Sequence, residues 1–285
     1  MVEIKIDTKI YDKETPTWCP GCGDYGVLLA LKRAAAILNL DPNKTVLVTG
    51  IGCSSKINSY FYSYGIHTIH GRAASVAQGI KLANPDLEVI VAGGDGDAFA
   101  IGTEHLVHIA RRNPDITYIV MDNQIYGLTK GQVSPTSEEG FVSITTPYGS
   151  FEKPVNGPLL ALASGATFIA RGFAGDPIFL TDLIVEGIKH KGFALIDVFS
   201  PCVTWNKVNT YDWYKQHTYK LENHDPTDIK KAFEILQDEE KFGLGIIYKT
   251  EKPTLEEKLP RKTSFKPFDK LEVDKSIEEL YEEFL

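Results

Sequence analysis

This sequence of 285 residues is poor in three things: long apolar runs, positive charge and cysteine. No apolar run approaches the ~20 residues of a transmembrane helix, so we predict no membrane span. The net charge of −8, from 38 acidic and 30 Lys or Arg residues, argues against nucleic acid and anionic membranes as partners. The first residues, MVEIKIDTKIYDKE, lack the apolar core of a signal peptide, and we expect a cytoplasmic protein.

The chain has only four cysteines, so their placement matters more than their number. A disulfide framework is not expected in a long chain without an export signal. Cys19 and Cys22 form a Cys-x-x-Cys motif, while Cys53 and Cys202 stand alone. A structural zinc site usually pairs two such motifs, and a redox dithiol would leave two cysteines without a role. One iron–sulfur cluster would use all four, but spacing alone leaves the choice open.

Along the chain, short apolar runs typical of buried strands alternate with segments whose apolar residues recur at helical spacing. The order predicts a three-layer α/β/α fold around a mainly parallel sheet, either one large domain with an appendage or two smaller ones. The strands predicted from apolar runs are Thr45–Thr49, His67–His70, Val89–Ala92, Thr117–Met121, Phe168–Ala170 and Phe193–Phe199. The predicted helices are Tyr25–Leu38, which Asp24 can cap, Ala73–Ala83, one that opens near Ala98 and ends at Arg111–Pro114, Leu159–Gly165 and Ile178–His190.

Polar residues follow two successive strands within the segment 88–131. Asp95 lies in the glycine-rich loop GGDGD, and Asn123 follows the next strand. Carboxyl ends of parallel strands share one edge of a sheet, which is where open α/β sheets bind ligands. Carboxylate and amide oxygens suit Mg²⁺, and the glycines let backbone approach an anion. The pattern favours a metal–diphosphate site; the alternative is a tight turn with a capping Asn.

At these residues the chain resembles a known family. GDG, a helix, a strand and then Asn is typical of thiamine diphosphate (ThDP) enzymes. GDGDAFAIG followed by DNQIYGLTKGQVSPTS resembles the β subunit of a 2-oxoacid:ferredoxin oxidoreductase, over about Trp18 to Cys202. The resemblance implies Mg²⁺ on Asp95, Asn123 and the Ile125 carbonyl. It also implies one 4Fe–4S cluster, held by Cys19, Cys22, Cys53 and Cys202.

A larger set of residues is expected to line ThDP. The resemblance implies His70, Gly71, Arg72, Ala73, Gly96, Asp97, Gly127 and Leu128; the loop at the end of the first predicted strand adds Ile51, Gly52, Cys53 and Ser54. Without the family, His70 is equally well explained as a buried histidine with a satisfied ring.

The implied activity is oxidative decarboxylation of a 2-oxoacid, such as pyruvate or 2-oxoglutarate. Coenzyme A takes the acyl group, and electrons pass through the cluster to a ferredoxin. The chain has one ThDP signature and no internal repeat, so we expect an α subunit, in a heterodimer or a dimer of heterodimers, to complete the active site. Two alternatives are a ThDP decarboxylase or synthase without a redox cluster, and a scaffold built on a four-cysteine zinc site.

Two lysines are candidates for substrate selection. Lys56 lies three residues past Cys53. Lys130 lies three residues past Gly127, and many relatives have glycine at the position of Lys130. Either could bind the second carboxylate of a dicarboxylic 2-oxoacid; both could equally be solvated surface lysines.

We divide the chain into an N-terminal arm (1–17), a ThDP and iron–sulfur domain (18–202) and a charged extension (203–285) that packs on this domain or on a partner. The irregular loop after Gly131, with four prolines up to residue 158, is expected to be functional or a binding surface. Within the extension we predict a strand at Leu244–Tyr248 and an amphipathic helix at 269–285.

Overall fold

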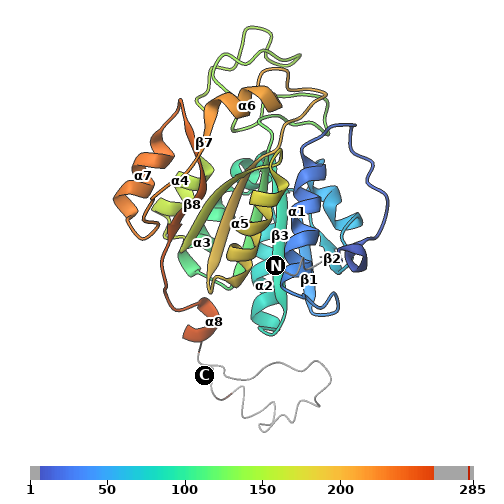
Figure 1. Ribbon diagram of the computed structural model, residues 1–285, viewed down its shortest axis with the longest axis vertical. Coiled ribbons are helices and arrows are strands. Elements are labelled where there is room, and N and C mark those ends of the chain that lie inside the picture. Colours follow the sequence, from blue (N-terminus) through green and yellow to red (C-terminus); the bar gives the residue numbers. More distant parts are fainter. Residues whose placement is uncertain (1–6, 260–281, 283–285) are drawn as a thin grey trace, which may run out of the picture.

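A sheet of eight strands forms the middle layer of the computed structural model, which describes residues 7–259 and 282 (Figure 1). The strand order is β2-β1-β3-β4-β6-β5-β8-β7, and every neighbouring pair is parallel except β5 with β8. The strands are β1 Thr45–Thr49, β2 Tyr64–His67, β3 Glu88–Gly94, β4 Ile116–Asp122, β5 Phe168–Phe173, β6 Phe193–Phe199, β7 Thr218–Lys220 and β8 Phe242–Lys249. The predicted mainly parallel α/β/α fold is confirmed.

Helices cover both faces of this sheet (Figure 1). They are α1 Asp24–Ile37, α2 Ala73–Ala83, α3 Thr103–Arg112, α4 Gly157–Ala163, α5 Pro177–Lys189, α6 Tyr211–His217, α7 Ile229–Gln237 and α8 Leu255–Lys258, with short helices η1 Lys9–Tyr11, η2 Ser54–Ser59 and η3 Gly96–Ile101. Alternate strand residues point to opposite layers: Leu47 belongs to the core layer that includes α1 and α5, whereas Val46 and Val48 belong to the layer that includes α2, α3, α4 and α7. Burial on both faces explains the continuous apolar runs.

Three local predictions differ from the structure. Strand β2 covers Tyr64–His67 rather than His67–His70, because its pairing with β1 ends at Thr49 and the chain then turns at Gly71, with φ +71°. The helix expected near Ala98 is divided into the π-helix η3 and α3. Asp24 was predicted to cap the first helix but is its first residue, and its carboxylate accepts the Ser200 hydroxyl at 2.7 Å.

Residues beyond Cys202 join the same sheet. The predicted strand at Leu244–Tyr248 is confirmed as β8, which pairs with β5 and carries β7 at the sheet edge. At the other end, Tyr11 of the predicted arm is buried and stacks on Phe61 at 5.3 Å between ring centroids. The division into three segments stays a prediction, and the amphipathic helix expected at 269–285 lies outside the described residues except for Glu282.

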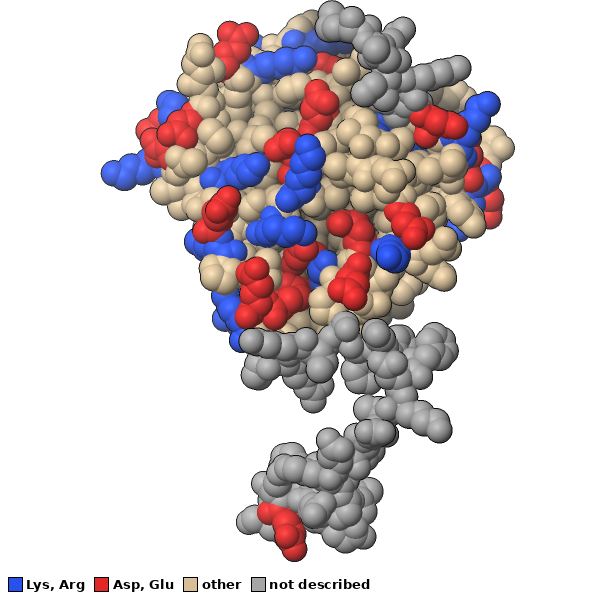
Figure 2. Space-filling view, turned by 60° about the horizontal axis from the view of Figure 1, so that its bottom comes forward, with Lys and Arg blue, Asp and Glu red and all other residues tan. Residues whose placement is uncertain are grey.

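The distribution of surface charge and the length of the helices concern the sequence predictions about nucleic acid and membranes. Acidic and basic side chains lie side by side over the face drawn in Figure 2, rather than forming one large basic area. Within residues 7–259 and 282, no helix has the length and apolar character needed to cross a bilayer.

Candidate cofactor and cysteine site

Asp95 and Asn123 are brought together by two neighbouring parallel strands. Gly94 at the end of β3 pairs with Met121 in β4, so the loops that follow begin side by side. The Asp95 carboxylate is buried where the two loops meet. Burial raises the pKa of Asp95 to about 6. A cation beside this carboxylate would offset the cost of burying its charge.

The hydroxyl of Thr136 lies 2.8 Å from Oδ2 of Asp95 and 2.8 Å from Oδ1 of Asp122. A hydroxyl has one proton and can donate to only one of these oxygens at a time. Burial also raises the pKa of Asp122 well above its usual range. Two buried carboxyl groups that share one donor repel each other when both are charged. A divalent cation on Asp95 would offset this repulsion.

The predicted magnesium ligands offer only oxygen. Asn123 Oδ1 accepts from the Ile125 backbone N–H at 3.0 Å, which fixes the loop and leaves the amide oxygen a second lone pair. A carboxylate, an amide oxygen and the Ile125 carbonyl suit a hard cation such as Mg²⁺. Among the described residues, no group of three or more His, Cys, Asp or Glu side chains could hold a metal ion, and a site with one carboxylate is not such a group.

Asp97 joins the loops predicted to line the cofactor. Its Oδ1 accepts hydrogen bonds from the backbone N–H groups of Ile51 at 2.9 Å and Gly71 at 2.8 Å, and lies 2.7 Å from His70 Nδ1. The backbone at Gly50 comes so close that an added Cβ would lie 2.0 Å from Asp97 Oδ2. The loops after β1 and β2 are therefore held against η3 by one buried carboxylate. The His70 side chain is 36% exposed, so it is not the enclosed histidine of the alternative interpretation.

The loop after β4 packs directly on η3. A Cβ at Gly96 would lie 2.1 Å from the ring of Tyr126, so only glycine fits. The Tyr126 hydroxyl donates to the Gly96 carbonyl at 3.3 Å.

All four cysteines line one cavity of about 90 Å³. They come from the turn before α1, the loop after β1 and the segment after β6. Trp18 and Trp205 form part of its wall, and Trp18 Nε1 donates to the Cys53 carbonyl at 2.7 Å. Burial raises the pKa of Cys53 to about 11 and that of Cys22 further. A positively charged iron–sulfur core would be needed to keep such thiols as thiolates.

The cysteine cavity shares a wall with the cofactor loop. Asn123, Gly127 and Leu128 line it together with the cysteines. A Cβ at Gly127 would lie 3.5 Å from Cys53 Sγ and 3.6 Å from Cys202 Sγ. The predicted metal loop and the predicted cluster ligands are thus in contact.

Comparison with known proteins identifies the family of this chain. Residues 50–198 match the family described as thiamine pyrophosphate enzyme, C-terminal TPP binding domain. Residues 202–263 match the family described as the C terminal of the pyruvate ferredoxin oxidoreductase beta subunit. The β subunit of 2-oxoacid:ferredoxin oxidoreductase 1 from Aeropyrum pernix is 46% identical over 259 residues, 86% of this chain and 81% of that protein. This chain belongs to the β-subunit family of 2-oxoacid:ferredoxin oxidoreductases.

Other relatives of this β subunit are named after one substrate, 2-oxoglutarate. The 2-oxoglutarate synthase subunit KorB of Methanocaldococcus jannaschii is 40% identical over 87% of this chain and 93% of its own length. Among solved structures, the 2-oxoglutarate:ferredoxin oxidoreductase of Magnetococcus marinus, with 2-oxoglutarate, coenzyme A and succinyl-CoA bound, aligns with a TM-score of 0.87 and 46% identity. The alignment covers 90% of this chain and 89% of that chain.

The two candidate lysines of this β subunit lie in different surroundings. Lys56 lines the cysteine cavity, and its Nζ donates to the Thr17 hydroxyl at 2.6 Å. Lys130 is exposed in the loop after β4, with φ +76°, and its backbone N–H donates to the Gly127 carbonyl. Their part in substrate choice stays a prediction.

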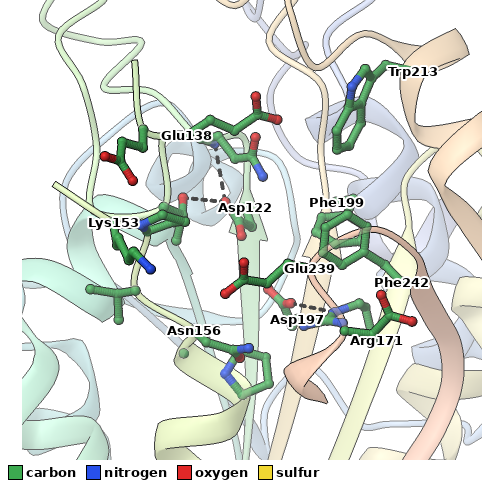
Figure 3. A pocket seen from close by; sticks show the side chains of 18 residues that line it. Asp122, Glu138, Lys153, Asn156, Arg171, Asp197, Phe199, Trp213, Glu239 and Phe242 are labelled. Carbon is green, nitrogen blue, oxygen red and sulfur yellow. Dashed lines mark hydrogen bonds and ion pairs between the residues drawn. The ribbon is translucent and has the colours of Figure 1, made fainter. Parts of the chain in front are cut away.

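A larger cavity, of about 380 Å³, was missed by the sequence analysis (Figure 3). Its walls come from the loop after β4, the strands β5 and β6 and the segment 238–242. Arg171 and Asp197, in neighbouring strands at paired register, form an ion pair in its wall. The signal for this cavity in the sequence was one charged residue in each of two apolar strands, Arg171 in β5 and Asp197 in β6.

Proposed function

We propose that this β subunit acts in the oxidative decarboxylation of a 2-oxoacid to an acyl-CoA and carbon dioxide, with a ferredoxin as electron acceptor. The ligands named for the Magnetococcus marinus enzyme support this reaction. 2-Oxoglutarate and succinyl-CoA differ by one carbon, which leaves as carbon dioxide. The carbonyl carbon rises to the oxidation level of a carboxylic acid, so two electrons must leave, and ferredoxins take them one at a time.

The cofactor would be ThDP with Mg²⁺. Asp95, Asn123 and the Ile125 carbonyl would hold the metal against the diphosphate, and bound ThDP would supply the carbanion chemistry of decarboxylation. The task of Asp97 is to hold the surrounding loops in place, through its contacts with Ile51 and Gly71. With Nδ1 directed to Asp97, His70 has Nε2 left to meet the cofactor.

The electron path would begin at one 4Fe–4S cluster on Cys19, Cys22, Cys53 and Cys202, a group that accepts and passes on single electrons. Trp18 and Trp205 would limit the access of water to it. Trp18 also fixes the Cys53 loop through its bond to the carbonyl. Because Gly127 has no side chain, the cofactor loop can lie directly against two of the cysteines.

An α subunit would complete the enzyme. The β-subunit names of the relatives imply such a partner, and the match to a TPP-binding family covers one domain only. We infer that the activating carboxylate and the pyrimidine pocket come from that subunit. Since the family consists of ferredoxin oxidoreductases, we propose neither a decarboxylase without a redox centre nor a zinc scaffold.

The observation that carries this proposal is the shared wall: four cysteines and the loop that bears Asn123 line the same cavity. The α–β complex, purified without oxygen, should reduce ferredoxin only when 2-oxoglutarate or pyruvate and coenzyme A are all present. The full-length β chain alone should not. Decarboxylation by the complex at an unchanged rate without any electron acceptor would contradict the proposal.

A further inference from the structure

The cavity of about 380 Å³ is lined by Asp122 and by none of the four cysteines, and it contains groups that the proposed reaction does not use (Figure 3). Its size falls within the range of sites that bind small molecules. Two aromatic side chains, Phe199 and Phe242, form apolar parts of its wall.

An incompletely satisfied ion pair lies at its base. Arg171 Nε donates to Asp197 Oδ2 at 3.0 Å, and the two residues are 4% and 1% exposed. Within the described part of the chain, Arg171 Nη1 and Asp197 Oδ1 have no hydrogen-bond partner. The guanidinium carbon lies 5.3 Å from the centre of the Phe199 ring and 5.6 Å from that of Phe242, which holds the group rigidly. One charged donor and one charged acceptor are therefore available side by side.

A second buried acceptor lines the same cavity. Gln124 is 7% exposed, and its Oε1 also has no partner among the described residues. Buried polar groups are normally hydrogen-bonded, because an unpaired one is costly. The lining of the cavity thus contains one donor and two acceptors that a polar ligand could pair with.

The charge of the residues that line the cavity indicates the sign of the charge on that ligand. Six carboxylate residues line the cavity against two basic ones, Arg171 and Lys153. Glu239 points between Asp122 and Asp197 in Figure 3. These acids lie on separate walls, and no group of three or more among the described residues could hold a single metal ion. An organic cation that spans the walls suits them better.

We propose that this cavity binds a basic α-amino acid, arginine or lysine. The ligand carboxylate meets Arg171 Nη1, and its α-ammonium group meets Asp197 Oδ1. The aliphatic part packs on the aromatic wall, and the side-chain cation faces Glu239. A basic residue at the C-terminal end of a partner's chain has the same carboxylate and side-chain cation, with an amide N–H in place of the α-ammonium group, so the experiment separates a free ligand from a partner residue.

Calorimetric titration of L-arginine and L-lysine into the α–β complex and into the full-length β chain tests this directly. We expect one saturable site. Agmatine lacks the carboxylate and L-citrulline lacks the side-chain charge, so each should bind at least about tenfold more weakly, as loss of a charged hydrogen bond predicts. The measurement needs neither turnover nor a bound cofactor, so its outcome is independent of the proposed function.

Two variants and a matched control locate the site. Asp197→Asn keeps the shape of a buried wall residue, and Glu239→Gln alters an exposed rim residue, so the second tests the proposal even if the first fails to fold. Both should weaken L-arginine binding by about ten- to a hundredfold. Glu240→Gln, one residue further and outside the cavity lining, should bind like the unaltered chain.

Binding to the β chain but not to the complex would support the same chemistry with a residue of the α subunit as occupant; binding to both would support a free ligand. No saturable binding by either folded sample overturns the proposal. Equal binding by Glu239→Gln and Glu240→Gln overturns it as well.

Discussion

His70 Nδ1 lies 2.7 Å from Asp97 Oδ1, an oxygen that also accepts the backbone N–H groups of Ile51 and Gly71. Three loops from three strands are therefore joined at one carboxylate oxygen.

We expect Asp97→Ala to lower the free energy of unfolding by about 2–5 kcal/mol, because it leaves buried backbone donors unpaired. It should also weaken binding of ThDP with Mg²⁺, since three lining loops lose their common support. Urea denaturation and calorimetry measure the two effects. Asp182→Ala, at an exposed position of α5, serves as the control. Unchanged stability in Asp97→Ala would show that the loops do not rely on it.

Asp95→Ala should abolish retention of ThDP while the fold survives. Asp95 supplies the only full negative charge in the proposed protein ligands of Mg²⁺, and a neutral methyl group cannot replace it. Titration of ThDP with Mg²⁺ into the α–β complex checks this, again beside Asp182→Ala. An affinity equal to that of the unaltered complex would remove Asp95 from the metal site.

Lys130→Ala, and more weakly Lys56→Ala, should lower kcat/KM for 2-oxoglutarate far more than for pyruvate. Only 2-oxoglutarate keeps a second carboxylate, and a charged hydrogen bond to it contributes about 1.5–3 kcal/mol, or roughly ten- to a hundredfold. Steady-state assays on both substrates decide, with the exposed Lys215→Ala as control. Equal losses on the two substrates would assign these lysines to the cofactor or to the fold.

Stability should fall as the pH rises from about 5 to 8, because of Glu88 at the start of β3. Burial raises the pKa of Glu88 to about 7, and Lys81 opposes this only in part. The folded state then binds more protons than the unfolded state between the ordinary pKa and about 7, so the free energy of unfolding decreases through this interval.

Glu88→Gln should remove the part of that decrease that Glu88 causes, roughly 3 kcal/mol, and leave the part due to Asp95 and Asp122. Urea denaturation at several pH values compares the two proteins. Parallel curves for Glu88→Gln and the unaltered chain would show that Glu88 titrates normally.

The sequence was most informative where strands are buried on both sides. The bounds predicted for Thr45–Thr49 and Phe193–Phe199 agree with β1 and β6, since continuous apolar runs have clear ends. Strand β2 was placed three residues too late because its side chains are exposed and only backbone pairing defines it. The four cysteines were grouped through the family resemblance, because their number and spacing alone left the choice open.

The large cavity could not be predicted in the same way. Arg171 and Asp197 are 26 residues apart and meet only through the register of β5 and β6. Glu138 and Glu239 reach the same space from two distant segments without regular periodicity. The charged residues within β5 and β6 mark buried polar groups, but the walls around them depend on tertiary packing that local sequence does not specify.

The central claim is that one chain holds both the cofactor loop and the redox centre. Electron paramagnetic resonance of the α–β complex tests it most directly. The complex is purified without oxygen and reduced by 2-oxoglutarate with coenzyme A. Cys53→Ser is compared with Thr204→Ala, which changes the same cavity wall without loss of a thiol. We predict a reduced-cluster signal in the unaltered complex and in Thr204→Ala. In Cys53→Ser this signal should be lost while ThDP binding persists, because a hydroxyl cannot replace a thiolate ligand. An undiminished cluster signal in Cys53→Ser would contradict the account.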